Sequence, residues 1–307
     1  MNALLLMFLA CGEKDTTEET TTEDTATTET EGVALSDFIY VTEAATGDDS
    51  CFAGESGVLG YEIASSSWNA QDVDTSLVTT ISLDAEVIDF ESDDPVEEAF
   101  VDIFWSNTVS GTSDSSDVSA EDGSVSIEVE ACSPFSYRVY TDPALEETKV
   151  TIEANTVEKP TSTATELNSV SSATYRVITA LMGISPDDDK GLVAGTMYDC
   201  NEEAIEGAQV VVRDVDGNIP ESLVVKYFVD DFPNRTQEWT SDDGLWLAVN
   251  VPAGTWYVDA YVSDGAGGHT VKGSTVIEVS ADSINISNIH TGFGDGIKYP
   301  ESCLVSE

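Results

Sequence analysis

Basic side chains are scarce in this sequence. Its 307 residues include 11 Lys and Arg against 59 Asp and Glu, which gives a formal net charge of −48 at pH 7. No Lys or Arg occurs between Lys14 and Arg138. A surface of this sign repels nucleic acid phosphates and anionic lipid head groups. We therefore expect no nucleic acid partner, and we interpret the acidic groups as a solvated surface rather than as a metal site.

Signatures of catalysis are also missing. The sequence has two histidines, His269 and His290, and neither lies in an HExxH motif or near a GxSxG motif. The segment from Asp214 to Asn218 resembles part of a calcium-binding loop. The spacing and the distal Glu of an EF-hand are absent there, so a hairpin turn is the better interpretation. We expect a protein that is not an enzyme and that needs no cofactor and no metal.

The sequence lacks a hydrophobic run of the roughly 20 residues that a membrane-spanning helix needs. It begins with a short apolar stretch, MNALLLMFLACG, which contains Cys11. This stretch resembles the lipobox of bacterial lipoprotein signal peptides, with Phe8 where Leu is usual. The resemblance implies a signal peptide over residues 1–11, lipidation of Cys11, and a membrane anchor. The expected location is the bacterial cell envelope, at the outer membrane and facing the periplasm or the cell surface.

A low-complexity segment follows the cysteine. Residues 13–32 are almost only Thr, Glu and Asp, with too few apolar groups to offset the entropy of ordering the backbone. Like charges along such a segment repel each other and keep it extended. Residues 12–35 are therefore predicted to be a disordered acidic spacer.

The remaining cysteines are few and widely spaced. Apart from Cys11 there are four, Cys51, Cys132, Cys200 and Cys303, and no CxxC motif of a zinc or thioredoxin-like site. An even number of cysteines in an exported protein indicates two disulfides. Three connectivities are possible. We favour Cys51 with Cys132 and Cys200 with Cys303, because each bond would then close one half of the chain.

Short β-type segments dominate the rest of the sequence. They are rich in Val, Tyr, Trp and Thr, and they are separated by Asp-Gly, Pro and Asn. This pattern predicts an all-β fold with two tandem β-sandwiches, over residues 36–157 and 191–307. Residues 158–190 are predicted to hold a Pro/Thr/Ser linker and one short helix at 171–183. The helix prediction depends on apolar residues at helical spacing and a glycine C-cap, namely Tyr175, Ile178, Leu181, Met182 and Gly183.

The two halves resemble each other in sequence. Residues 87–104 align with 197–214 after one residue is gained or lost in a turn, and residues 120–130 align with 241–251. The pattern resembles the carboxypeptidase regulatory-like, or transthyretin-like, β-sandwich family, which belongs to the broader immunoglobulin/transthyretin-like architecture. The matching positions in the second copy are Gly195, Asp199, Gly207, Ala208, Val210, Asp243, Gly244, Pro252, Ala253, Gly254 and Tyr257.

The first copy matches this family pattern at fewer positions. They are Asp89, Pro95, Val96, Ala99, Val101 and Gly123. The pattern is broken by Glu98 in the first copy and by Ala204 in the second. The resemblance implies an accessory module with no catalytic role.

Residues 240–262, TSDDGLWLAVNVPAGTWYVDAYV, hold the best candidate for a binding face. The DDG and VPAG segments are typical of turns, so two paired strands are predicted. Period-2 alternation assigns one face of each strand to the core, through Leu245, Leu247, Val249, Val251, Trp256, Val258, Ala260 and Val262. The opposite face then carries Trp246, Tyr257, Asp259 and Tyr261, together with Asn250.

Two hypotheses follow for this opposite face. Aromatic rings beside a carboxylate form a platform for a sugar ring, which would make the chain a carbohydrate-binding lipoprotein. Alternatively, the helix with Tyr175, Ile178 and Leu181 covers the aromatic side chains. The leading functional hypothesis is a non-catalytic, lipid-anchored envelope protein with a structural or adhesive role, whose partner is a glycan or an envelope protein. Fold class alone does not choose between these functions.

Overall fold

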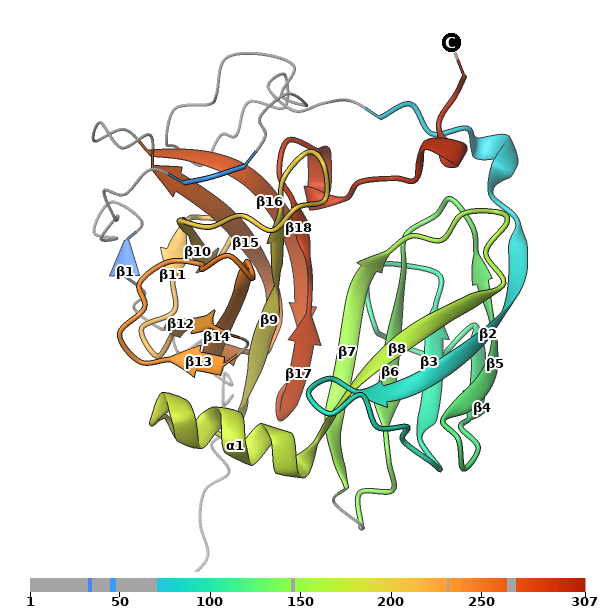
Figure 1. Cartoon of the computed structure of the whole chain (residues 1–307), viewed down its shortest axis with the longest axis horizontal. Coiled ribbons are helices and arrows are strands. Elements are labelled where there is room, and N and C mark those ends of the chain that lie inside the picture. Colours follow the sequence, from blue (N-terminus) through green and yellow to red (C-terminus); the bar gives the residue numbers. More distant parts are fainter. Residues whose placement is uncertain are drawn as a thin grey trace, which may run out of the picture. The chain divides into compact units, whose positions relative to one another are not determined.

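The computed structural model describes residues 33–34, 45–47, 71–144, 147–230, 232–263 and 269–306. The predicted signal segment with Cys11, most of the spacer, and Cys51 lie outside these ranges. The described chain consists mostly of β-strands with one α-helix (Figure 1). The predicted all-β sandwich class is therefore confirmed.

The first repeat comprises seven strands. They are β2 (Thr80–Asp89), β3 (Phe100–Phe104), β4 (Ser115–Val118), β5 (Ser124–Glu130), β6 (Phe135–Tyr140), β7 (Thr148–Thr156) and β8 (Ala164–Ser171), preceded by the short helix η3 (Thr75–Leu77). Alternation in β2 and β5 places every second side chain inside, so Leu83, Val87 and Ile127 are buried. These residues face Ile103 and Phe135 of the second layer in one hydrophobic core.

The second repeat comprises ten strands and two short helices. They are β9 (Lys190–Tyr198), β10 (Ala208–Arg213), β11 (Asn218–Ile219), β12 (Val224–Val229), β13 (Phe232–Asn234), β14 (Leu245–Pro252), β15 (Gly254–Ser263), β16 (His269–Val279), β17 (Ser283–Ile286), β18 (Ile289–His290), η4 (Gly294–Gly296) and η5 (Glu301–Cys303). Its core joins Val193 and Ala248 from one layer with Val210, Val258 and Ile277 from the other.

Six strands of each repeat pair in the same way, whereas β4 pairs with β3 in the first repeat and β12 pairs with β14 in the second. In the first, β2 pairs with β5 and runs parallel to β8, while β3 pairs with β6 and β6 with β7. In the second, β9 pairs with β14 and runs parallel to β17, while β10 pairs with β15 and β15 with β16. The likeness between the halves of the sequence therefore corresponds to one strand topology used twice.

Equivalent polar contacts occur in the two repeats. The carboxylates of Asp89 and Asp199 each accept hydrogen bonds from backbone N–H groups of the turn that follows. The hydroxyls of Ser119 and Thr240 each accept a hydrogen bond from a backbone N–H and donate one to a backbone carbonyl. Because these bonds satisfy backbone groups at the layer edges, they explain why Asp and a hydroxyl residue recur at these positions.

The two repeats share one continuous sheet. Strand β17 runs parallel to β9 of its own repeat and also parallel to β7 of the first repeat. Lys149 Nζ, in β7, is 2.5 Å from the Asp282 carboxylate, which precedes β17. The Asn155 amide donates to Thr275 Oγ1 and Ser287 Oγ, at 2.9 and 3.1 Å. The repeats are thus joined by backbone hydrogen bonds as well as by side chains.

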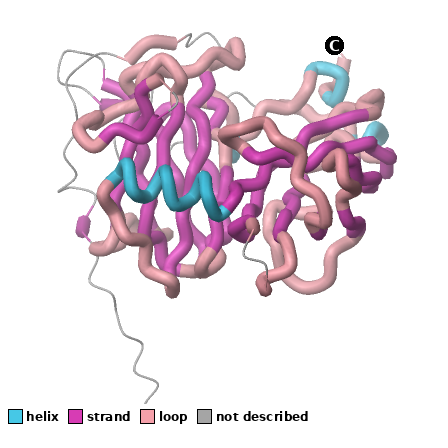
Figure 2. Tube along the Cα trace, turned by 60° about the horizontal axis from the view of Figure 1, so that its bottom comes forward, coloured by secondary structure: helices cyan, strands magenta, loops and turns pink. Residues whose placement is uncertain are grey.

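Helix α1 (Ser172–Met182) connects the repeats, as the apolar spacing predicts. The Ser171 hydroxyl accepts a hydrogen bond from Thr174 N at 3.0 Å, and Gly183 ends the helix with φ of 69°. Figure 2 shows α1 lying across one face of the strands. Strand β8, however, occupies much of the segment predicted as a linker, because its backbone pairs with β2 and β7.

Two short N-terminal segments differ from the sequence prediction. Strand β1 (Val33–Ala34) pairs with β11 of the second repeat, although it falls in the predicted disordered spacer. Ala45 N donates to Ser263 O, and Thr46 N donates to Glu206 O, so residues 45–47 also contact the second repeat. Both segments were expected to be a spacer or a part of the first sandwich.

The predicted disulfide connectivity is wrong. Cys132 is bonded to Cys303, over a sequence separation of 171 residues. Cys200 is also disulfide-bonded, and its partner lies outside the described residues. The segment around η5 returns to the first repeat, where Val305 N donates to Asp72 O. This return brings Cys303 to Cys132 and makes the bond a link between repeats.

Peptide mapping without reductant should connect Cys132 to Cys303. The double variant Cys132→Ala/Cys303→Ala should lose about 2–5 kcal/mol of unfolding free energy, because its unfolded chain is less constrained. Denaturant titration measures this loss, and the parent protein in reductant provides the comparison. A peptide that links Cys132 to Cys51 would contradict the connectivity.

Candidate functional site

The predicted hairpin of residues 245–262 does not form. Strand β14 pairs with β9 and β12, whereas β15 pairs with β10 and β16. The segment between β14 and β15 therefore passes from one sheet to the other. Trp246 and Asp259 are consequently not cross-strand neighbours, and the single face predicted for the four binding residues does not exist.

Trp246 is buried in the core of the second repeat. Only 1% of its surface is exposed, and it packs with Ala248 and Val258. Within the described part of the chain, its Nε1 has no hydrogen-bond partner. The other face of β14, with Leu247 and Val249, packs under α1. Both faces are buried because β14 lies between two apolar layers, and the unbroken apolar run LWLAV is the signal for such burial.

Tyr257, Asp259 and Tyr261 do share a face of β15, as alternation predicts. Asp259 and Tyr261 are nearly fully buried, at 1% and 2% exposure. Arg213 Nε, in β10, donates to Asp259 Oδ2 at 2.5 Å, and its guanidinium lies 4.7 Å from the Tyr257 ring centre. The Ser274 hydroxyl donates to Asp259 Oδ1 at 2.6 Å.

This arrangement is a structural ion pair. Burial raises the pKa of the Asp259 carboxyl, while the hydrogen bond and the charge of Arg213 act in the opposite direction. The carboxylate oxygens already accept bonds from Arg213 and Ser274, so they are not available to a sugar. Trp246, Tyr257, Asp259 and Tyr261 therefore do not form the predicted platform. Sequence reasoning missed Arg213 because cross-strand register is not visible in the sequence.

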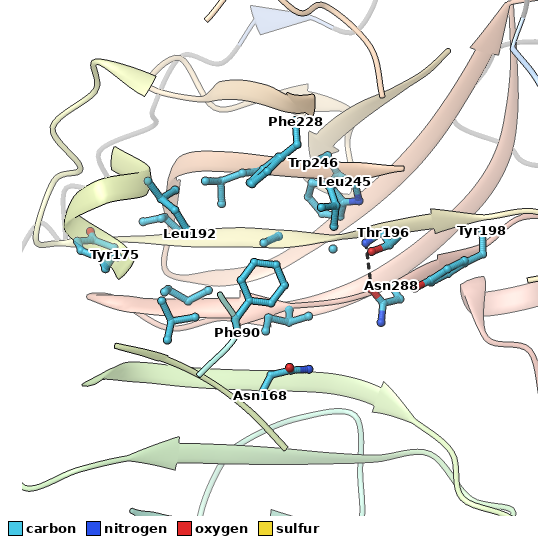
Figure 3. A pocket seen from close by; sticks show the side chains of 17 residues that line it. Phe90, Asn168, Tyr175, Leu192, Thr196, Tyr198, Phe228, Leu245, Trp246 and Asn288 are labelled. Carbon is cyan, nitrogen blue, oxygen red and sulfur yellow. Dashed lines mark hydrogen bonds between the residues drawn. The ribbon is translucent and has the colours of Figure 1, made fainter. Parts of the chain in front are cut away.

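An apolar groove lies beside α1 and is the best-formed candidate site (Figure 3). Its volume is about 220 Å³. Strands β9, β14 and β17 supply its floor, α1 supplies one wall, and the loop after β2 supplies Phe90. The side chains that the figure labels around it are Phe90, Asn168, Tyr175, Leu192, Thr196, Tyr198, Phe228, Leu245, Trp246 and Asn288.

Asp89 holds the groove together from the first repeat. Its carboxylate accepts hydrogen bonds from Ser171 N at 2.6 Å and from Thr174 Oγ1 at 3.0 Å, at the start of α1. The next residue, Phe90, donates its backbone N–H to Ser169 O at 2.8 Å and places its ring in the groove. Burial alone would raise the pKa of Asp89, but the hydrogen bonds from Ser171 and Thr174 prevail and lower it.

Two asparagine side chains line the groove. Asn288 Oδ1 accepts a hydrogen bond from Thr196 N at 3.0 Å. Asn168 Nδ2 donates to the buried carboxylate of Glu153 at 3.1 Å. Tyr137 also donates to Glu153, and burial raises the pKa of both groups. Asn168 therefore belongs to a buried hydrogen-bond network, whereas Asn288 is half-buried and accepts a bond from the backbone of β9.

No cluster of three or more His, Cys, Asp or Glu residues suited to a metal occurs among the residues described. His290 is stacked on Tyr198, with ring centres 5.2 Å apart. Burial lowers the pKa of His290, so the neutral imidazole is favoured. The stacked His290 serves as a packing group next to the groove end. The described site offers apolar surface and neutral hydrogen-bonding groups, which suits binding rather than covalent chemistry.

Comparisons with known proteins give only distant likenesses. No protein-family model and no curated protein matches the sequence. The TIE protein of Bacillus anthracis matches 69% of this chain and 34% of its own, with 11% identity and a TM-score of 0.24. Shaft pilin SpaA of Lactobacillus rhamnosus GG matches 69% of this chain and 98% of its own, with 8% identity and a TM-score of 0.22.

A third match is BcpA, the major pilin subunit of Bacillus cereus. It covers 69% of this chain and 99% of its own, with 8% identity and a TM-score of 0.22. At these TM-scores the matches carry no inference about function. The site is therefore interpreted from its own residues.

The variant Asp89→Asn should destabilise the fold by about 1.5–3 kcal/mol, because hydrogen bonds to a charged acceptor are lost. The folded-state pKa of Asp89 is lowered, so its contribution is complete above the unfolded pKa of about 3.9 and disappears as pH falls through the folded value. Urea titrations at pH 7 and pH 3 should show that the difference in unfolding free energy between parent and variant is smaller at pH 3. Asp84→Asn, exposed on the same strand, is the control. An equal difference in unfolding free energy at both pH values would contradict the prediction.

Proposed function

We propose that this chain is a non-catalytic, lipid-anchored protein of the bacterial cell envelope, and that its two sandwiches act as one structural or adhesive unit. The coupling of the repeats carries the proposal. Strand β17 pairs with β7 across the boundary, and Cys132–Cys303 links the repeats a second time. Such coupling serves a protein that must hold its shape under load, because flexing between sandwiches would break backbone hydrogen bonds.

The anchor in this proposal is Cys11. The apolar stretch before Cys11 and the acidic spacer after it support a lipid-anchored globular part held away from the membrane. None of the helices in the described ranges is long and apolar enough to span a bilayer. The sandwiches are proposed to be of the carboxypeptidase regulatory-like type, and the location to be the outer membrane.

Replacement of the lipid-bearing residue should release the protein. The variant Cys11→Ala should move from the detergent phase to the aqueous phase in a detergent partition assay, because a thioether-linked lipid can no longer form. The variant Cys132→Ala/Cys303→Ala should stay in the detergent phase and so separates lipidation from disulfide loss. Unchanged partition of Cys11→Ala would contradict the anchor.

The two repeats should unfold together in denaturant. Trp105 reports on the first repeat, since its Nε1 donates to Glu128 O, and Trp246 reports on the core of the second. Because β17 belongs to the hydrogen-bond ladders of both repeats, the two indole N–H signals in nitrogen-15 NMR spectra should disappear at the same midpoint. The variant Cys132→Ala/Cys303→Ala tests whether sheet pairing alone is enough to keep the two midpoints equal. Two separate midpoints in the parent protein would overturn the single-unit proposal.

A further inference from the structure

We propose that the groove beside α1 binds a small uncharged lipophilic molecule with an apolar body and one polar head. This proposal goes beyond the structural role and does not depend on it. The groove volume of about 220 Å³ exceeds that of an engineered apolar cavity of about 150 Å³ that holds benzene. Its size therefore suits a body of about ten non-hydrogen atoms.

The groove lining selects against ions. The 17 residues that line it include no Asp, Glu, Lys, Arg or His. An ammonium or carboxylate group buried there would lose hydration without gaining a partner of opposite charge. Leu192, Phe228 and Ile284 instead provide apolar contact at the end nearest α1. Binding there becomes more favourable in proportion to the apolar area of the ligand that is buried.

The opposite end provides a neutral hydrogen-bond donor. Asn288 uses its Oδ1 to accept from Thr196 N, and no partner for its Nδ2 group occurs among the described residues. Figure 3 shows Asn288 beside Thr196 and near Tyr198, away from Tyr175 and Leu192. A hydroxyl or carbonyl oxygen on the ligand head could accept from Nδ2. The ligand would therefore lie along the groove with its head at Asn288 and its body toward α1.

Charges around the groove disfavour anions further. Burial, together with the nearby carboxylates of Asp282 and Asp188, raises the pKa of Tyr175 to about 12. Lys149 Nζ lies 4.9 Å from the Tyr175 ring centre, but it is already paired with Asp282 at 2.5 Å. Because Lys149 offsets Asp282, the carboxylate of Asp188 leaves a net negative charge near Tyr175, which repels a fatty carboxylate but not an uncharged alcohol of the same length.

The test compares three ligands with one tail: 1-octanol, octanoate and octylammonium. Isothermal titration uses the full-length chain with Cys11→Ala, so that no detergent or membrane lipid competes. We expect 1-octanol to bind in the submillimolar range and both ions to bind at least tenfold more weakly. Equal or tighter binding of either ion, or no binding of 1-octanol up to its solubility limit, would overturn the proposal.

Variants locate the binding. Ala194→Phe, on the groove floor, should weaken 1-octanol binding at least tenfold, whereas Val118→Phe, at an exposed position in β4, should leave it unchanged. Asn288→Leu should weaken the alcohol severalfold but leave binding of n-octane unchanged. If Ala194→Phe does not fold, as judged by thermal melting, Phe90→Trp fills the groove from the other side. Unchanged 1-octanol binding in a folded groove-filling variant would place the ligand elsewhere and overturn the assignment.

Discussion

The parallel pairing of β7 with β17 is the contact on which the rest of this structure depends. Each strand would otherwise expose a row of unpaired N–H and C=O groups at the edge of its sheet. Pairing makes β17 an interior strand between β7 and β9, and its Asn285 is fully buried there. The segments near this joint, α1 and the return to Cys303, are placed by it. Two separate hydrophobic cores are thereby joined through one sheet.

The groove forms close to the pairing of β7 with β17, because α1 is shorter than the sheet face on which it packs. Helix α1 has 11 residues, so it extends about 16 Å and cannot cover the whole sheet face. It packs on Leu192, Leu247 and Ile284 but leaves Ala194 partly exposed. Phe90 reaches over part of the remaining surface because Asp89 fixes its backbone against α1. The same carboxylate that accepts hydrogen bonds from the start of α1 therefore also shapes the wall of the groove.

The sequence was a good guide to local structure and to repetition. The apolar spacing and Gly183 predicted α1, and the aligned segments predicted a topology that occurs twice, since periodicity and turn residues act locally. It was a poor guide to partners distant in sequence. Alternation correctly groups Tyr257 with Tyr261 on one face. It does not indicate which strands pair with each other, so it wrongly assigns Trp246 to a free face. Cys303 pairs with Cys132 because the C-terminal segment returns to the first repeat, which no local pattern records.

Several of the few basic residues have structural roles, and this helps to keep the surface acidic. Arg213 and Arg138 pair with carboxylates on neighbouring strands, at Asp259 and Asp102. The Arg235 guanidinium donates to carbonyls in the last turn of α1, where the helix dipole favours a cation. Cations used in this way neutralise only their own partners, so most of the net charge of −48 must be screened by solvent ions. An anionic partner would find little attraction at such a surface, which leaves an uncharged apolar groove as the favourable place for a ligand.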